Sequence, residues 1–302
     1  MRILVIFTGG TIGCGSKGGV LTPQKSNSYR LLEMYKEVDA NIEFDAVQPY
    51  TILSENLCAN HLNALYRCIA GVNLGQYAGV IVAHGTDTLP YTAAFLSYQF
   101  GLSCPPIVLV SANFPLDDAR SNGFINFCSA VSFIKSGQGR GVFVSYTNTG
   151  DSRTAIHRGQ ELLPHAPYSD SLFSLDGNVY GYVENGGFVR NSSYKERTER
   201  MNGARLSGKV LYLKAYVGIT YPRLDSSVKA VLMEGYHSGT LSTDEPALSE
   251  FCAQADMLSI PVFLTGACDG FNYDSKLRFH DLKIKVLPPM SPIAAYVKLW
   301  LM

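Results

Sequence analysis

Two glycine-threonine turns, each directly after a short aliphatic run, constrain the fold of this chain more than any other feature. The first turn spans Thr8 to Ile12 and follows Ile3 to Phe7, and the second spans Ala83 to Thr88 and follows Gly79 to Val82. Both aliphatic runs are typical of strands buried on two faces in a parallel sheet. Because ligands of open α/β sheets bind beyond the carboxyl ends of the strands, we expect the two turns to face one site.

Both turns carry hydroxyl side chains, and the second also carries a carboxylate. Those predicted to converge on the site are Thr11, Thr86 and Asp87. The glycines beside them, such as Gly10 and Gly85, lack Cβ atoms, so the backbone can turn sharply and its N–H groups can approach a ligand. The Gly/Ser/Lys-rich segment from Gly13 to Gly19 has the composition of a loop that closes over a bound ligand.

Length, charge and cysteine usage narrow the class of protein. At 302 residues the chain exceeds the usual size of one hydrophobic core, which favours two domains. A formal net charge of zero without a long Lys/Arg run argues against nucleic acid or a membrane as the main partner, and favours a small molecule. Seven scattered cysteines without a CxxC pair give no sign of a metal or redox centre. No signal peptide or bilayer-spanning stretch is found, so we expect a cytoplasmic protein.

Hydrophobic periodicity predicts alternating strands and helices along the first part of the chain. The expected helices are Ser28–Glu37, Asn60–Gly71, Leu89–Phe100 and Gly123–Ser136, and the further expected strands are Ile42–Val47, Ile107–Val110 and Gly141–Tyr146. This rhythm predicts an α/β fold whose larger N-terminal domain has a doubly wound, mainly parallel sheet. Turn residues between Asp176 and Val189 predict a hairpin that closes this domain.

A second, smaller α/β domain is expected after a polar linker. We place the catalytic domain at residues 1–190, the linker at 191–208 and the smaller domain at 209–302, because 191–208 is charged and lacks apolar periodicity. In the smaller domain, the predicted strands are Lys209–Tyr216, Ala230–Glu234 and Pro261–Thr265, and the predicted helices are Asp225–Lys229, Glu245–Met257 and Ser291–Leu301.

The two turns carry a resemblance to the bacterial L-asparaginase family. That family has a TGGTI turn near its amino terminus and an HGTDT turn after a later strand, and both are matched here letter for letter. Three further segments agree in order and spacing, namely Leu53–Leu57, Ser111–Gly123 and Pro289–Pro292. Both turns in this order make a chance match improbable, and the similarity spans the whole chain.

The resemblance implies hydrolysis of L-asparagine to L-aspartate and ammonia, without metal or organic cofactor. Thr11 is then the nucleophile that forms an acyl-enzyme, and Thr86 assists proton transfer or positions the hydrolytic water. Asp87 holds the α-ammonium of the substrate, and Ser54 holds its α-carboxylate.

Two neighbouring positions complete the expected site. Backbone N–H groups of the turn that contains Gly85 and Thr86 are the natural oxyanion donors. Glu55 stands where many relatives carry Gln, and its carboxylate adds attraction for the ammonium while it repels the carboxylate of the substrate.

The chain departs from the family pattern at two points. The lysine that relatives place after the strand matching Gly141–Tyr146 is missing from the stretch Arg153 to Arg158. His157 or Arg158 is left to substitute, and we favour His157, because a histidine can act as a base near neutral pH. The lid tyrosine of relatives is also missing, since the matching position is Val20.

Simpler readings and rival functions remain open. Thr11, Thr86 and Asp87 could merely cap helices, and His157 could be an ordinary loop histidine. The chain could be a catalytically impaired amino-acid-binding or regulatory homologue, or an amidohydrolase that acts on glutamine or D-asparagine, since one methylene gives little discrimination. A transfer-RNA amidotransferase component is disfavoured by the lack of an additional amino-terminal domain and of a basic surface. The resemblance also implies self-association as a dimer or tetramer.

Overall fold

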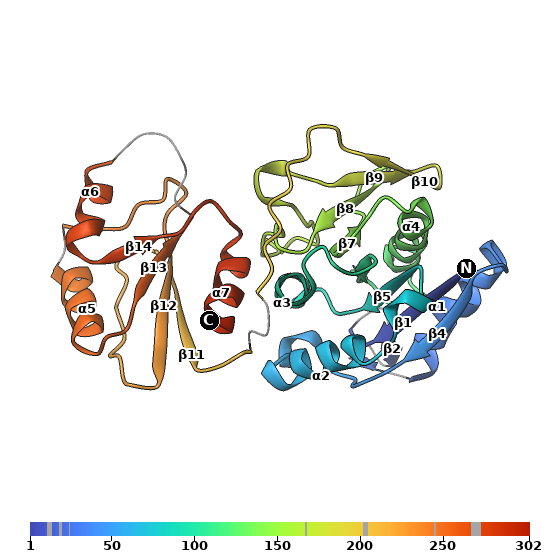
Figure 1. Cartoon of the computed structure of the whole chain (residues 1–302), viewed down its shortest axis with the longest axis horizontal. Helices are drawn as coiled ribbons and strands as arrows, with labels where there is room; N and C mark the ends of the chain where they lie inside the picture. The colour runs from blue at the N-terminus through green and yellow to red at the C-terminus, as the bar shows by residue number, and fades with distance from the viewer. Residues whose placement is uncertain are drawn as a thin grey trace. The chain divides into compact units, whose positions relative to one another are not determined.

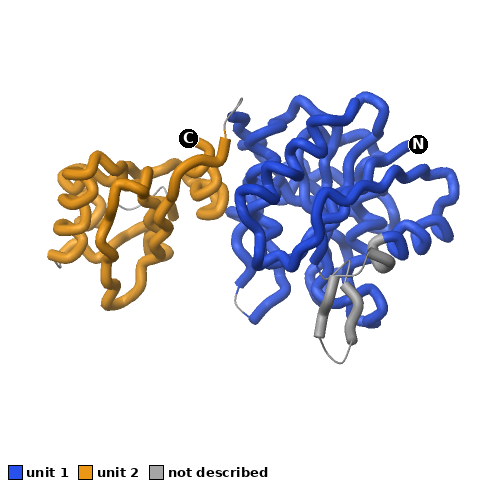
Figure 2. The backbone as a smooth tube through the Cα atoms, turned by 90° about the horizontal axis from the view of Figure 1, so that it is seen from below, with its two compact units in different colours: residues 1–202 blue, residues 203–302 orange. Residues whose placement is uncertain are grey.

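The computed structural model describes residues 1–10, 14–17, 20–23, 25–166, 168–201, 205–244, 246–266 and 273–302. Thr11 therefore lies outside the described residues, as do parts of the loop expected to close over the ligand. The chain divides into two compact units, residues 1–202 and residues 203–302, which are coloured separately in Figure 2.

The first unit is built on an eight-stranded sheet of order β10-β9-β8-β7-β6-β5-β1-β4. Its strands are β1 (Arg2–Phe7), β4 (Glu43–Val47), β5 (Gly79–Ala83), β6 (Ile107–Val110), β7 (Val142–Tyr146), β8 (Thr154–Arg158), β9 (Gly181–Glu184) and β10 (Gly187–Arg190). The five adjacent strands β4, β1, β5, β6 and β7 are parallel to one another. The remaining strands β8, β9 and β10 join the sheet by antiparallel pairing. A separate two-stranded ribbon pairs β2 (Cys14–Lys17) with β3 (Val20–Pro23).

Helices cover both faces of the large sheet. They are α1 (Lys25–Val38), α2 (Ala59–Ala70), α3 (Leu89–Phe100) and α4 (Gly123–Ser136). Side chains of α1 and α4, such as Leu31 and Phe127, share one core with alternate strand residues such as Val5. The helix α3 packs on β7 and contacts α2, and Figure 1 shows α3 and α4 on opposite sides of the sheet. The expected doubly wound α/β domain is confirmed.

The second unit is a smaller α/β layer with its own parallel sheet, of order β11-β12-β13-β14. Its elements are β11 (Lys209–Lys214), β12 (Val228–Glu234), α5 (Pro246–Met257), β13 (Val262–Thr265), α6 (Asp274–Asp281), β14 (Ile284–Val286) and α7 (Pro292–Leu301). One face of the sheet packs on Phe251 of α5 and Phe279 of α6, and the other packs on Ala295 and Leu299 of α7.

One helix expected in this unit is absent from the described residues. The helix predicted at Asp225–Lys229 is wrong, because β12 already begins at Val228 and a turn closed by Ser227 N–H on Asp225 Oδ1 precedes it. An Asp two residues before a donor favours such a turn over a helix, and the β-branched residues that follow favour a strand. The helix α6 and the strand β14 were not expected.

Residues 191–201 are fixed to the first unit, although their composition predicted a linker. Glu196 pairs with the buried Arg158, and the side chain of Gln160 donates to the carbonyl of Glu199 at 2.6 Å. The N–H of Met201 donates to the carbonyl of Tyr98 at 2.8 Å. Polar composition predicted a linker here, and the hydrogen bonds of the segment go to buried residues of the sheet domain.

Candidate active site

The two glycine turns touch one another at the carboxyl ends of the adjacent strands β1 and β5. Gly9 and Gly10 have φ values of +109° and +80°, a region that glycine adopts easily. A Cβ atom on Gly10 would overlap the backbone of Gly85, so the two turns are in direct backbone contact. The expectation that both turns meet at one edge of the sheet agrees with this packing.

The loop after β4 completes this edge. Ile52 joins the first turn through two hydrogen bonds, donating to the carbonyl of Thr8 at 3.1 Å and accepting from the N–H of Gly10 at 3.2 Å. Two residues later Ser54 is buried, and a Cβ atom on Gly85 would lie 2.5 Å from its Cβ. The lack of side chains in both turns therefore lets this loop pack against them.

Ser54 and Asp87 are hydrogen-bonded, although 33 residues separate them in the chain. Ser54 Oγ donates to Asp87 Oδ2 at 2.9 Å, and the Asp87 side chain is exposed to solvent. Thr86 beside it is half-buried, and Glu55 next to Ser54 is exposed. The structure thus brings Ser54, Gly85, Thr86 and Asp87 together at the end of β5.

Helix capping does not account for the Asp87 carboxylate. The N-cap residue of α3 is Thr88, whose side chain makes no capping hydrogen bond. Thr88 Oγ1 donates instead to the carbonyl of Ser54 at 2.9 Å, which ties the loop after β4 to the second turn. The Asp87 carboxylate is therefore oriented by Ser54 and is accessible from solvent. An accessible carboxylate can form charge-assisted hydrogen bonds with a cationic group.

His84 is buried beneath the second turn and has both ring nitrogens engaged. Nδ1 lies 2.8 Å from the carbonyl oxygen of Gly85, and Nε2 lies 2.9 Å from Thr92 Oγ1. A carbonyl only accepts, so Nδ1 carries the hydrogen and Nε2 accepts from the threonine. Burial lowers the pKa of His84 to about 4, so it is neutral at physiological pH and orders the turn.

His157 lies inside β8 rather than in a loop. Strand pairing sets Ala155 opposite Tyr146, the last residue of β7, and His157 opposite Val144, two residues further from the carboxyl end. His157 Nδ1 lies 2.8 Å from Ser174 Oγ, and its Nε2 is buried without a hydrogen-bond partner. Burial lowers its pKa to about 4, with a smaller contribution from His165. A catalytic role for His157 stays a prediction.

A second histidine of this region, His165, was not singled out by its sequence. It belongs to the connection between β8 and β9, which crosses the ends of β6 and β7. Asp170 in that connection accepts from Asn113 Nδ2 at 2.9 Å, and Leu172 N–H donates to Asn148 Oδ1 at 2.7 Å. No motif or spacing distinguishes His165, because long-range contacts alone bring it to this edge.

Metal ligands and membrane-spanning helices are not found in the described part of the chain. Within those ranges, no three His, Cys, Asp or Glu side chains gather where a metal ion could be held. Among the same residues, no helix is long and apolar enough to cross a bilayer.

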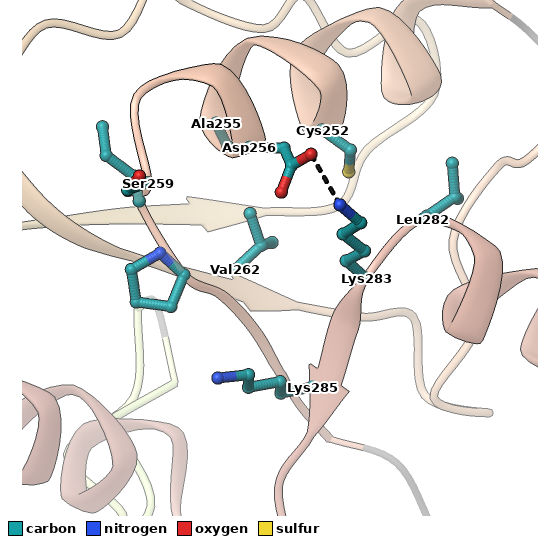
Figure 3. Close-up of a pocket in the computed structure, with 10 residues that line it drawn as sticks. Cys252, Ala255, Asp256, Ser259, Val262, Leu282, Lys283 and Lys285 are labelled. Atoms are coloured by element: carbon teal, nitrogen blue, oxygen red, sulfur yellow. Dashed lines mark hydrogen bonds and ion pairs between the residues drawn. The ribbon is translucent and has the colours of Figure 1, made fainter.

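A separate hollow of about 470 Å³ lies in the second unit, beside α5 and β14 (Figure 3). Asp256 and Lys283 face one another across it, with their charged atoms 2.6 Å apart. The Asp256 carboxylate is thus already paired with Lys283. None of the predicted site residues lines this hollow.

Comparison with known proteins identifies the family. The family described as "Asparaginase, N-terminal" matches residues 2–174. The chain belongs to the asparaginase family. The structure of the thermostable L-asparaginase from Thermococcus kodakarensis superposes with a TM-score of 0.81 at 19% identity, covering 99% of this chain and 92% of that one. The probable cytoplasmic L-asparaginase from Campylobacter jejuni gives a TM-score of 0.76 at 21% identity, covering 99% and 94%.

Curated sequences similar to this asparaginase-family chain carry another name. A glutamyl-tRNA(Gln) amidotransferase subunit from Methanosphaera stadtmanae is 29% identical over 317 residues, which is 99% of this chain and 71% of that protein. The protein of the same name from Pyrococcus abyssi is also 29% identical, over 318 residues, again covering 99% and 71%. The family is therefore shown, and the amide that this member cleaves is a separate question.

Proposed function

We propose that the protein is an asparaginase that hydrolyses L-asparagine to L-aspartate and ammonia. The observation that carries the proposal is the hydrogen bond between Ser54 and Asp87, at the point where Gly10 and Gly85 bring the two turns into contact. This arrangement offers a carboxylate for the α-ammonium and a hydroxyl for the α-carboxylate of a free amino acid. Asp87 directly follows Thr86 in the chain, and Gly10 directly precedes Thr11, so the two threonines that would act on the side chain belong to the same pair of turns.

The proposed reaction passes through an acyl-enzyme. Thr11 Oγ attacks the carboxamide carbon, and N–H groups of the turn containing Gly85 stabilise the oxyanion. Ammonia leaves, and a water positioned by Thr86 hydrolyses the ester. Asp87 and Ser54 keep the substrate in register, with Glu55 modulating selectivity. No step calls for a metal ion or an organic cofactor.

A second candidate is an amidotransferase component, favoured by the names of the similar curated sequences. In that role the same site would release ammonia for the amidation of glutamyl-tRNA(Gln). Stimulation of ammonia release by glutamyl-tRNA(Gln) would favour this candidate over a free-standing asparaginase.

An ammonia assay with L-asparagine, L-glutamine and D-asparagine tests the proposal. We expect the highest kcat/KM with L-asparagine, and loss of at least about 10³-fold in Thr11→Ala and Thr86→Ala, because each removes a reacting hydroxyl. Thr220→Ala, an exposed threonine of the second unit, is the control. Binding of asparagine without ammonia release at any pH would leave a binding or regulatory homologue as the function.

We also propose that the protein self-associates as a dimer or tetramer and acts in the cytoplasm. Light scattering of the purified chain tests the first point. A monomeric mass at micromolar concentration would contradict it.

A further inference from the structure

The peptide group that joins Gly85 to Thr86 lies in the second turn of the candidate site. Hydrolysis of a side-chain amide develops negative charge on the carbonyl oxygen of the substrate, and fixed hydrogen-bond donors stabilise that charge. A backbone N–H group can be such a donor only when its peptide group has the required orientation. The contact that fixes the orientation of this peptide therefore bears directly on the reaction.

Steric contacts leave this orientation open, because one of the two residues is a glycine. Gly85 has no Cβ atom, so its backbone dihedral angles have a wider allowed range than those of other residues. The chain on either side is fixed, since His84 N–H donates to the carbonyl of Val110 at 2.9 Å. On the other side, Leu89 N–H donates to the carbonyl of Thr86 at 3.2 Å. The peptide between these two points needs a contact of its own.

The imidazole of His84 supplies that contact. Its Nδ1 carries the hydrogen and lies 2.8 Å from the Gly85 carbonyl oxygen. Thr92 of α3 is fully buried and donates to Nε2 at 2.9 Å, which holds the ring in this tautomer. Burial also keeps the ring neutral at physiological pH, because it lowers the pKa of His84 to about 4. The Gly85 carbonyl is therefore held toward a buried and immobilised ring.

The Thr86 N–H then has a defined direction. In a trans peptide the carbonyl and the following N–H point in opposite directions, so this N–H points away from the His84 ring. In the part of the chain that the structure describes, no hydrogen bond from the Thr86 N–H is found. The next residue, Asp87, is exposed and accepts from Ser54. The N–H is thus a donor available to a ligand that Asp87 and Ser54 hold.

We propose that His84 is a positioning residue whose Nδ1–H holds the Thr86 N–H as an oxyanion donor. The assignment rests on the proposed hydrolysis of an amide. As a nucleophile bonds to the amide carbon, the π electron pair of the C=O bond moves to oxygen, and the Thr86 N–H donates a hydrogen bond to that oxygen while it keeps its proton. Without the His84 contact the peptide can rotate, which turns the Gly85 carbonyl and its partial negative charge toward the oxyanion.

Three variants separate this role from a contribution to folding. His84→Leu removes the donor to the Gly85 carbonyl. His84→Asn has nearly the same shape as His84→Leu but keeps a side-chain N–H near the Nδ1 position, which can still donate to Gly85. Both variants lose the hydrogen bond with Thr92, and Thr92→Val loses only that bond.

We expect His84→Leu to lose about 10²- to 10³-fold in kcat, with KM for L-asparagine within about threefold of the wild type, because an oxyanion donor acts in the transition state. His84→Asn should recover most of the kcat that His84→Leu loses. Thr92→Val should retain kcat within about threefold of the wild type, because the bond from His84 to Gly85 remains. All three variants should unfold at lower urea concentrations, since each loses a buried hydrogen bond.

Nuclear magnetic resonance of the wild type gives a readout that does not depend on how the variants fold. Long-range ¹⁵N–¹H correlation at neutral pH should show His84 with its hydrogen on Nδ1 and with Nε2 unprotonated. The His84 signals are assigned as those missing from the spectrum of His84→Asn.

Three results would each overturn the assignment alone: wild-type kcat in a folded His84→Leu, a His84→Asn variant as slow as His84→Leu, or a hydrogen on His84 Nε2 in the wild type. Absence of ammonia release from the wild type with every amide tested would overturn the proposed function and this assignment together, whichever tautomer is found.

Discussion

The contact between Gly10 and Gly85 sets how close the two turns can lie. Replacing Gly10 by alanine adds one methyl group at this contact and tests whether the close approach is needed. Gly10→Ala places a Cβ atom on the Gly85 backbone at a φ of +80°, so it should separate the turns and lower kcat/KM by at least about 10²-fold, as misplacement of reacting groups does. Gly186→Ala is a matched control, because its φ is +75° and nothing lies within 4 Å of the new Cβ.

Both variants carry the same left-handed strain, about 1–2 kcal/mol. Urea unfolding measures the loss of stability that the two variants share, and the ammonia assay measures how their activities differ. Equal activity in the two variants would show that backbone contact between the turns is not needed.

The hydrogen bond from Ser54 to Asp87 predicts a binding defect rather than a chemical one. Ser54→Ala removes a donor to a carboxylate and the proposed holder of the substrate carboxylate, so KM for asparagine should rise by about 10- to 150-fold with a smaller change in kcat. Steady-state kinetics measure both constants. Ser249→Ala on α5 is the control, since that serine is exposed in the second unit. An unchanged KM would exclude Ser54 from substrate binding.

Residues of the candidate site differ in how far their sequence revealed them. Thr86 and Asp87 lie three and four residues after the buried strand β5, so their place at its end could be predicted from local pattern. Ser54 could be placed only through the family resemblance. His165 could not be found at all, because Asp170 and Leu172, further along the same connection, hold that segment through hydrogen bonds with Asn113 and Asn148 in distant loops.

Elements were predicted best where the hydrophobic period was clear. The helices α3 and α4 and the strand β6 have the predicted bounds, because each is buried along most of its length. The turn before β12 was mistaken for a helix, and the polar run at 191–201, predicted as part of a linker, is hydrogen-bonded to the sheet domain. Specific hydrogen bonds determine the structure of both segments, and the turn before β12 is closed by a hydrogen bond to Asp225.

The attachment of the 191–201 segment to the sheet domain contains a buried carboxylate. Glu161 is 4% exposed, and Asn178 Nδ2 donates to its two oxygens at 2.9 and 2.7 Å. The same amide of Asn178 donates to the carbonyl of Lys195 at 2.8 Å. Burial raises the pKa of Glu161 to about 7, while Asn178 and the neighbouring Arg197 oppose the rise.

A raised folded-state pKa makes stability depend on pH in a defined direction. Between about pH 4.5 and 7 the unfolded chain has lost the Glu161 proton while the folded chain keeps it, so the free energy of unfolding falls as pH rises through this window. The loss is on the order of 3 kcal/mol and levels off above pH 7. Glu161→Gln should remove this slope and be more stable than the wild type at pH 8.

Urea midpoints at about pH 5, 6, 7 and 8, followed by far-ultraviolet circular dichroism, measure the effect. Glu184→Gln in β9 is the control, because Glu184 is exposed. If Glu161→Gln keeps the wild-type slope, ionisation of Glu161 does not govern this part of the fold.

Among the described residues, each compact unit has hydrophobic core residues of its own. The sheet of the first unit is buried between its helices, and the second unit has cores on both faces of its own sheet. The chain has one tryptophan, Trp300, which packs in the second unit with Leu232 and Leu299. Its fluorescence therefore reports on the folding of that unit.

If each unit unfolds on its own, a core cavity should affect only the unit that contains it. Leu232→Ala should lower the urea midpoint of Trp300 fluorescence by about 1 M or more, since truncating a buried leucine to alanine costs about 2–5 kcal/mol. Leu109→Ala, in β6 of the first unit and equally buried, should leave that midpoint unchanged and instead lower the urea concentration at which ammonia release is lost. Equal shifts of the Trp300 midpoint in both variants would show that the two units unfold in one cooperative transition, because only coupled cores transmit a cavity from one sheet to the other.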